Sequence, residues 1–93
     1  MQGSIPPTYL TQSQAVQLIP CTLHSIIVSP NGSNASYADV HDGDNSTEPL
    51  RARIRCSADR STQVTFPTPL QLHRGLFIAF GANLHSVSVQ VST

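Results

Sequence analysis

The chain is a series of strand-length apolar runs separated by Pro, Gly, Asn and Ser, and none of these runs has the 3.6-residue spacing of an amphipathic helix. The last third is the clearest case, where LQLHRGLFIAF (70–80) and NLHSVSVQV (83–91) meet at the turn Gly81-Ala82-Asn83. In the closing run, valines at 87, 89 and 91 alternate with polar residues. Such alternation is typical of antiparallel strands with one solvated face. The sequence therefore predicts an all-β fold.

Strand signals recur along the whole chain at the spacing of about 8–12 residues that β-sandwiches and barrels share. The predicted strands are 15–19, 22–29, 35–41, 50–56, 61–66, 71–80 and 84–91. About seven strands are enough for two packed sheets. We therefore expect a small antiparallel β-sandwich of jelly-roll or immunoglobulin-like type.

The N-terminal part differs in composition from the remainder. Residues 1–14 are mostly polar, and Pro6-Pro7 favours an extended path. We expect residues 1–20 to form an extended arm and residues 21–93 to form the sandwich domain. Two interpretations of the arm remain open: a frayed terminus, or a segment that docks on a neighbouring subunit through Tyr9 and Leu10.

Charged residues make up only 11% of the chain, against roughly 25% in an ordinary soluble domain. Five arginines balance five acidic residues, lysine is absent, and the formal net charge is zero. This balance argues against a nucleic-acid binder, which needs a basic surface to neutralise phosphates. A surface of short hydroxyl side chains loses little rotamer entropy when it is covered. The composition therefore favours a component of an assembly.

The sequence shows no secretory signal and no apolar run of the roughly 20 residues needed to span a bilayer. We therefore expect synthesis in a cytoplasm, no membrane partner, and reduced, buried thiols at Cys21 and Cys56. A Cys21–Cys56 disulfide is the alternative if their strands are neighbours.

A row of arginines occupies one face of the predicted strand 50–56. Arg51, Arg53 and Arg55 alternate with apolar residues, which places the arginines on a common face about 6.5–7 Å apart. One interpretation is an ordinary solvated strand face. The other is a contact with a partner, because the planar guanidinium binds carboxylates through two parallel hydrogen bonds.

The segment Leu76–Phe80 (LFIAF) is apolar on both faces of a strand. One face suits the interior of a sandwich, and the other needs a cover, either a loop of the same chain or another subunit. The second alternative makes Phe77 a candidate interface residue and favours a homo-oligomer.

No pattern of reactive residues indicates catalysis or metal binding. The acidic segment 39–48 fails the EF-hand pattern from either possible start and is expected to be a polar hairpin loop with Asx turns. His24, His73 and His85, each next to apolar residues in a predicted strand, are expected to make local hydrogen bonds, and the HExxH, phosphate-cradle and Gly-x-Ser-x-Gly motifs are absent. We expect no enzymatic activity, no cofactor and no metal.

The runs LHSIIVSPNGSNASYADVHDG (23–43) and GLFIAFGANLHSVSVQV (75–91) together resemble small β-sandwich virion structural proteins of tailed bacteriophages. In that class a Leu-x-Ser-Ile-Val-like strand leads through a glycine turn to a Tyr-x-Asp strand. A Gly-Leu-Phe strand and a valine-rich strand then close the domain. The resemblance covers residues 23–91.

This resemblance implies a capsid decoration (cement) protein that binds major capsid subunits in the virion. Such proteins often form trimers at local threefold positions, and the class carries no catalytic residues. The alternative is a tail, neck or fibre module that contacts host glycans. Glycan sites usually expose aromatic rings, for which this chain offers Tyr9 and Tyr37 and no tryptophan.

Overall fold

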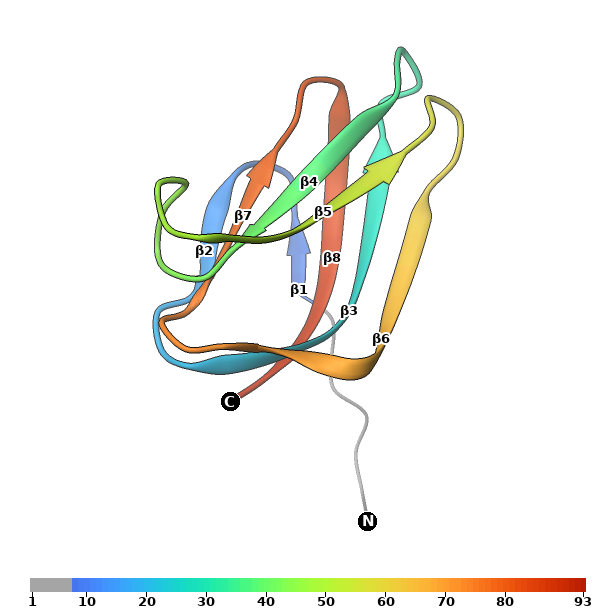
Figure 1. Ribbon diagram of the computed structural model, residues 1–93. Helices are drawn as coiled ribbons and strands as arrows, with labels where there is room; N and C mark the ends of the chain where they lie inside the picture. Colours follow the sequence, from blue (N-terminus) through green and yellow to red (C-terminus); the bar gives the residue numbers. More distant parts are fainter. Residues whose placement is uncertain (1–7) are drawn as a thin grey trace.

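The computed structural model describes residues 8–93, which form two antiparallel four-stranded sheets packed as a sandwich (Figure 1). The strands are β1 (Thr8–Leu10), β2 (Gln14–Gln17), β3 (Cys21–Pro30), β4 (Ser36–His41), β5 (Leu50–Cys56), β6 (Thr62–Leu72), β7 (Leu76–Phe80) and β8 (Leu84–Ser92). Residues 8–93 contain no helix that is long and apolar enough to cross a membrane.

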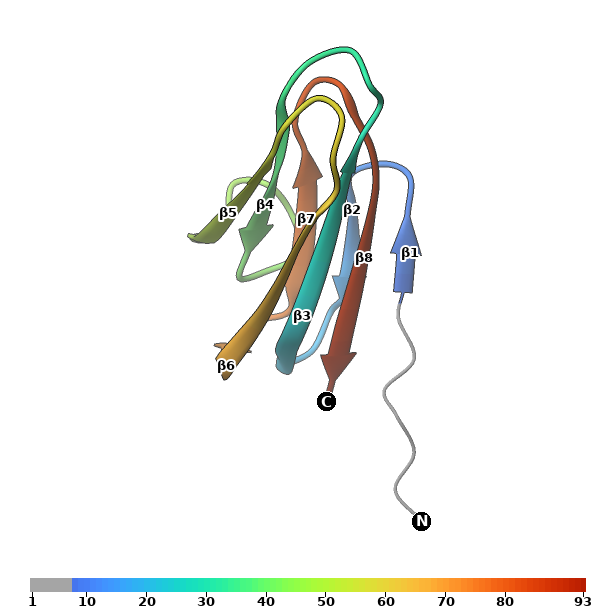
Figure 2. The same ribbon diagram turned by 90° about the vertical axis from the view of Figure 1, so that its right-hand side faces the viewer.

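The strand order is that of a jelly roll. Sheet A has the order β1-β8-β3-β6, and sheet B has the order β2-β7-β4-β5; the two layers are visible side by side in Figure 2. In an immunoglobulin-like sandwich the first and last strands lie in different sheets, whereas here β1 pairs with β8. The predicted all-β sandwich is confirmed, and of the two expected topologies the strand order is that of the jelly roll.

Both sheets contribute alternate residues to one apolar core. Sheet A supplies inward residues from all four of its strands, most of them from β3 and β8, and sheet B supplies those of β4, β5 and β7. The buried apolar residues are Leu10, Cys21, Leu23, Ile26, Val28, Ala38, Val40, Ile54, Cys56, Leu72, Leu76, Ile78, Val87 and Val89. The period-2 pattern that predicted the strands is thus also the pattern that fills the core.

The described part of the predicted arm belongs to the sandwich. Residues 8–10 add β1 to the edge of sheet A, and residues 14–17 add β2 to the edge of sheet B. Leu10 is only 1% exposed, and the Ser13 hydroxyl oxygen accepts the backbone N–H of Phe80 at 2.8 Å. Residues 8–93 therefore form eight strands, and the rest of the predicted arm, residues 1–7, lies outside the described residues.

Three predicted strands have wrong bounds, and one of them, predicted over 15–19, is β2, which ends at Gln17. The strand expected to stop at Pro67 continues as β6 to Leu72. Because β6 is an edge strand, a proline lacking an N–H is tolerated there, and the β3–β6 register shifts opposite His24, next to the prolines. The predicted strand 71–80 is instead broken at residues 73–75, where the chain crosses from sheet A to sheet B.

The outward face of β7 is covered in part by the same chain. Leu76 and Ile78 point into the core, while Phe77 is half-buried on the other face. The His41 ring packs edge-on against Phe77, with ring centroids 6.3 Å apart. The cover seen in the structure is a side chain at the end of a strand, β4, whereas a loop or another subunit was expected.

Candidate functional site

Three connections meet at one end of the sandwich, which we call the 42–49 end. They are the β2–β3 turn (18–20), the β4–β5 loop (42–49) and the β6–β7 turn (73–75). Gly75 marks where they touch, since a Cβ there would lie 2.5 Å from the Gln17 carbonyl oxygen and 3.2 Å from that of Gly43. Its φ of 138° also favours glycine. The 42–49 end therefore requires a residue without a side chain at position 75.

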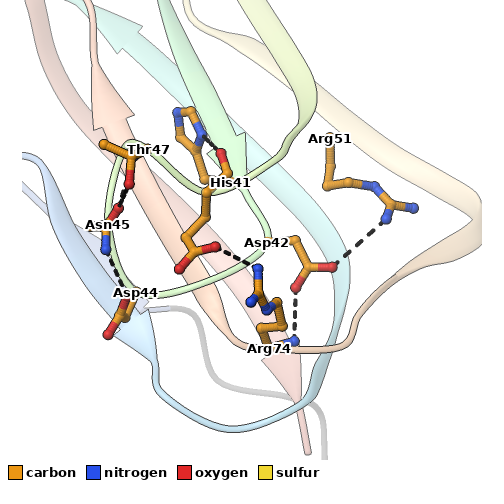
Figure 3. Close-up of polar contacts among 8 residues, drawn as sticks. His41, Asp42, Asp44, Asn45, Thr47, Arg51 and Arg74 are labelled. Carbon is orange, nitrogen blue, oxygen red and sulfur yellow. Dashed lines mark hydrogen bonds and ion pairs between the residues drawn. The ribbon is translucent and has the colours of Figure 1, made fainter.

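Asp42 is the buried polar centre of this end (Figure 3). Its Oδ1 accepts the backbone N–H of Arg74 at 2.8 Å. Its Oδ2 lies 3.7 Å from Nη1 of Arg51. One carboxylate thus connects the start of the β4–β5 loop to the β6–β7 turn and to β5.

The surroundings of Asp42 stabilise its charged form. Burial acts to raise the pKa of Asp42, but backbone hydrogen bonds from Arg74 and His73 and the charges of His73 and Arg51 outweigh it, so the pKa is lowered. The pKa of the nearby Cys21 thiol is raised, first by burial and then by the charge of Asp42. A thiol held in its neutral form is a poor nucleophile.

The remainder of the β4–β5 loop is fixed by further hydrogen bonds. Arg74 Nη1 donates to Glu48 Oε1 at 2.6 Å, and the His41 Nδ1–H donates to the Glu48 carbonyl at 2.9 Å. Asn45 Oδ1 accepts the backbone N–H of Thr47 at 2.9 Å, so the expected Asx turn is present. Hydrogen bonds within the chain therefore hold the shape of the loop.

The carboxylates of this polar cluster contact arginine side chains and backbone groups of the same chain. Asp42 and Glu48 are each paired with an arginine. No group of three or more His, Cys, Asp or Glu residues within 8–93 is placed to hold a metal ion.

Three large aliphatic side chains at the 42–49 end point into solvent, and we call them the apolar rim. Leu18 is 70% exposed, Ile19 is 55% exposed and Leu50 is 53% exposed. Leu18 and Ile19 follow β2 in the β2–β3 turn, and Leu50 begins β5 directly after the β4–β5 loop. Leu18 and Ile19 are neighbours in the chain, whereas Leu50 lies on β5, at the opposite edge of sheet B from β2; exposed apolar side chains at one end of a domain are candidates for contact with a partner.

The arginine row of β5 is partly occupied by its own chain. Arg53 donates from Nε and Nη2 to the two oxygens of Asp39 at 2.6 and 2.9 Å, and its guanidinium lies 4.1 Å from the centre of the Tyr37 ring. Arg51 faces Asp42 at the longer distance of 3.7 Å. Arg55 is exposed, and it lies opposite Tyr37 in the pairing of β4 with β5. The three arginines share a face as predicted, but they differ in what they contact.

The predicted interface residues do not form one site. Tyr9 is 61% exposed, and it lies on β1 at the edge of sheet A, while the arginines lie on β5 at the opposite edge of sheet B. Leu10 is in the core and is not available to a partner.

The sequence prediction missed the apolar rim. Alternation assigned Leu50 to the buried face, but the β4–β5 register shifts between Val40 and His41 and leaves Leu50 outside. Leu18 and Ile19 were predicted to lie in a strand. Their position directly before Pro20 is the signal that could have placed this apolar pair in a turn.

A shallow depression occupies the opposite end of the sandwich. It has a volume of about 270 Å³ and opens broadly to solvent between the β3–β4 and β5–β6 loops. Its lining is mostly polar and comprises Pro30, Asn31, Gly32, Ala58, Asp59, Arg60 and Ser61.

Both cysteines are buried and free, Cys21 in sheet A and Cys56 in sheet B.

No protein-family model, curated protein or solved structure matches this chain. The fold and the exposed surfaces are therefore the observations from which a function can be inferred.

Proposed function

We propose that this chain is a virion structural protein without enzymatic activity, and specifically a capsid decoration protein that stabilises the head by binding major capsid subunits. The observation that carries the proposal is the strand order. Jelly rolls with this arrangement of eight strands are common in viral capsid and lectin domains. Because a fold alone does not define a function, the surface has to support the same role.

The apolar rim supports attachment to a protein surface. The β4–β5 loop is already held by hydrogen bonds, so it loses little conformational entropy on binding, which favours affinity. Fully burying a Leu or Ile side chain contributes about 1.5–3 kcal/mol. Leu18, Ile19 and Leu50 are therefore the proposed anchors, and Arg55 is the proposed ligand for a partner carboxylate at the adjoining face.

The proposed mechanism is thermodynamic. A protein that binds only the assembled lattice stabilises that lattice by mass action, without any chemical step. In this proposal the chain acts as a homo-oligomer in the virion, after synthesis in the host cytoplasm.

The proposal is tested by binding purified protein to empty mature heads of the virus that encodes it. We expect saturable binding that is at least tenfold weaker in the double variant Leu18→Ser/Ile19→Ser, since tenfold corresponds to about 1.4 kcal/mol. The control is Asn34→Ala, an exposed position in the β3–β4 loop at the other end of the sandwich. Equal binding by both variants would remove the apolar rim from the proposal, and no binding to heads would contradict decoration.

The alternative function is a tail, neck or fibre module that binds host glycans. The polar depression at the end opposite the apolar rim favours it, because asparagine, aspartate and arginine side chains there can hydrogen-bond sugar hydroxyls, and lectins also use jelly rolls. No aromatic ring is among the lining residues, which weakens this alternative. Glycan-array binding that is lost in Asp59→Ala, without binding to heads, would favour it.

A further inference from the structure

The charged residues are segregated between the two sheets. The strands of sheet A read TYL, LHSVSVQVS, CTLHSIIVSP and TQVTFPTPLQL, without an Asp, Glu, Lys or Arg in any of these four described segments. The charged residues of 8–93 lie instead on β4, on β5 and in the loops and turns. A solvated sheet face normally carries interspersed charges that keep a protein soluble and monomeric.

The outward residues of sheet A form registered rows, one across all four strands and one across β8, β3 and β6. Ile26, Val28, Val87 and Val89 point into the core, so their strand neighbours point outward.

The central row is Tyr9–Ser88–Ile27–Gln63, read across β1, β8, β3 and β6. Its two largest apolar members are exposed, Tyr9 at 61% and Ile27 at 37%. The next row is Gln90–Ser25–Thr65. We call this surface the outer face of sheet A.

Many polar groups on this face already have partners within the chain. Ser25 donates to Gln90 Oε1 at 2.6 Å, and His24 Nε2 lies 2.7 Å from the Ser92 hydroxyl. Thr22 donates to Gln71 Oε1 at 3.1 Å. Polar groups that keep a hydrogen bond when they are covered impose a smaller desolvation cost. Covering this face therefore costs less desolvation free energy than covering a face whose polar groups lack partners.

We propose that the outer face of sheet A binds the same face of a second copy of this chain, in a two-fold symmetric pair. In such a pair the same patch must complement itself. A charged group near the axis would meet its own copy and be repelled, whereas hydroxyl and amide groups both donate and accept and so can bond to their own copies. Charge-free Ser, Thr and Gln rows around Ile27 and Tyr9 meet this requirement.

The size of the face suits a weak, reversible pair. The strands β1, β8, β3 and β6 hold 3, 9, 10 and 11 residues, so at a rise of about 3.3 Å per residue and a strand spacing of about 4.8 Å they cover about 520 Å² per copy. Two copies would bury about 1,000 Å², which is the size of a weak or transient interface. We therefore expect an association that depends on concentration in the micromolar range.

The other outward face lacks this self-complementarity. The face of sheet B carries charged side chains, among them the Arg53–Asp39 pair and the exposed Arg55, and a two-fold contact centred on Arg55 would bring this arginine near its own copy. The pairing is independent of the proposed attachment to heads, because it concerns two copies of this chain and is tested on the isolated protein.

The test is sedimentation equilibrium of the purified protein over a hundredfold range of concentration. We expect a monomer–dimer equilibrium that Ile27→Glu shifts to monomer, weakening association at least tenfold. The matched control is Leu50→Glu, since Leu50 is also an exposed strand aliphatic but lies at the 42–49 end. Circular dichroism checks that both variants keep the β fold.

Three outcomes would overturn the proposal: a monomer throughout the range, a trimer in place of a dimer, or equal weakening by Leu50→Glu. A second variant keeps the test sharp if Ile27→Glu does not fold. Ser88→Cys lies at the centre of the face, so mild oxidation should give a disulfide-linked dimer, while Ser46→Cys in the β4–β5 loop should not. Cross-linking of Ser46→Cys but not of Ser88→Cys would place the contact at the 42–49 end and would contradict the proposal.

Discussion

At the scale of single residues, the structure separates groups that look equivalent in the sequence. Asp42 and Asp44 lie in one acidic segment, yet Asp42 is buried and paired while Asp44 is exposed. Likewise, Arg53 is held by Asp39 and Tyr37, while Arg55 is exposed to solvent. Spacing placed these residues on a face or in a loop, but it carries no information on which charge finds a partner.

Asp42→Asn should destabilise the fold by about 1–3 kcal/mol, because a buried charged acceptor is lost. The folded pKa of Asp42 lies below its usual 3.8. Its contribution is therefore fully present above the unfolded pKa and is lost as the pH falls through the folded pKa. Urea unfolding between pH 7 and pH 2 should show a steeper acid loss in the native chain than in Asp42→Asn. Asp44→Asn is the control, and a loss equal to that of Asp42→Asn would contradict the assignment.

Arg53→Ser should lower the unfolding midpoint in urea more than Arg55→Ser does. The first change leaves the buried Asp39 carboxylate without its two hydrogen bonds, whereas the second removes an exposed side chain. Arg55→Ser should instead weaken binding to viral heads. The reverse ranking in stability would show that the Arg53–Asp39 pair contributes little.

At the scale of elements, periodicity predicted most strands and missed what depends on tertiary partners. The alternating patterns gave β3, β4, β5 and β8 to within one or two residues. β1 was missed because three residues in a polar segment carry no period, and its assignment depends on Leu10 entering the core. The end of β6 was misplaced because whether a proline ends a strand depends on whether that strand lies at an edge. The burial predicted for Leu50 was wrong, since exposure at a strand end depends on register.

Leu10→Ala should destabilise the protein by about 2–5 kcal/mol, the usual cost of a large-to-small change in a core. Tyr9→Ala, one residue earlier and exposed, should change the stability by less than about 0.5 kcal/mol. Chemical denaturation of both variants measures the difference. Similar small losses in both would mean that β1 adds little to the fold.

At the scale of the whole molecule, the two sheets enclose a core that holds both thiols. Cys21 is 4% exposed and Cys56 is 5% exposed. A thiol reagent should therefore label both only through global unfolding, with a rate that rises with urea in proportion to the unfolded fraction. Fully denatured protein gives the rate for free thiols. Labelling of one cysteine at a rate independent of urea would reveal local opening of its sheet.

The adjacency of the first and last strands of the described chain has a consequence for how the molecule comes to be folded. Pairing Thr8 with Val89 closes a loop of nearly the whole domain, and topologies dominated by such distant pairings fold in milliseconds to seconds. Until β8 inserts, one edge of β3 lacks its hydrogen-bond partners and the apolar inner face of sheet A is exposed to water. Such surfaces are prone to aggregate during biosynthesis. Production of the protein should therefore depend on temperature and on chaperones more than its small size would indicate.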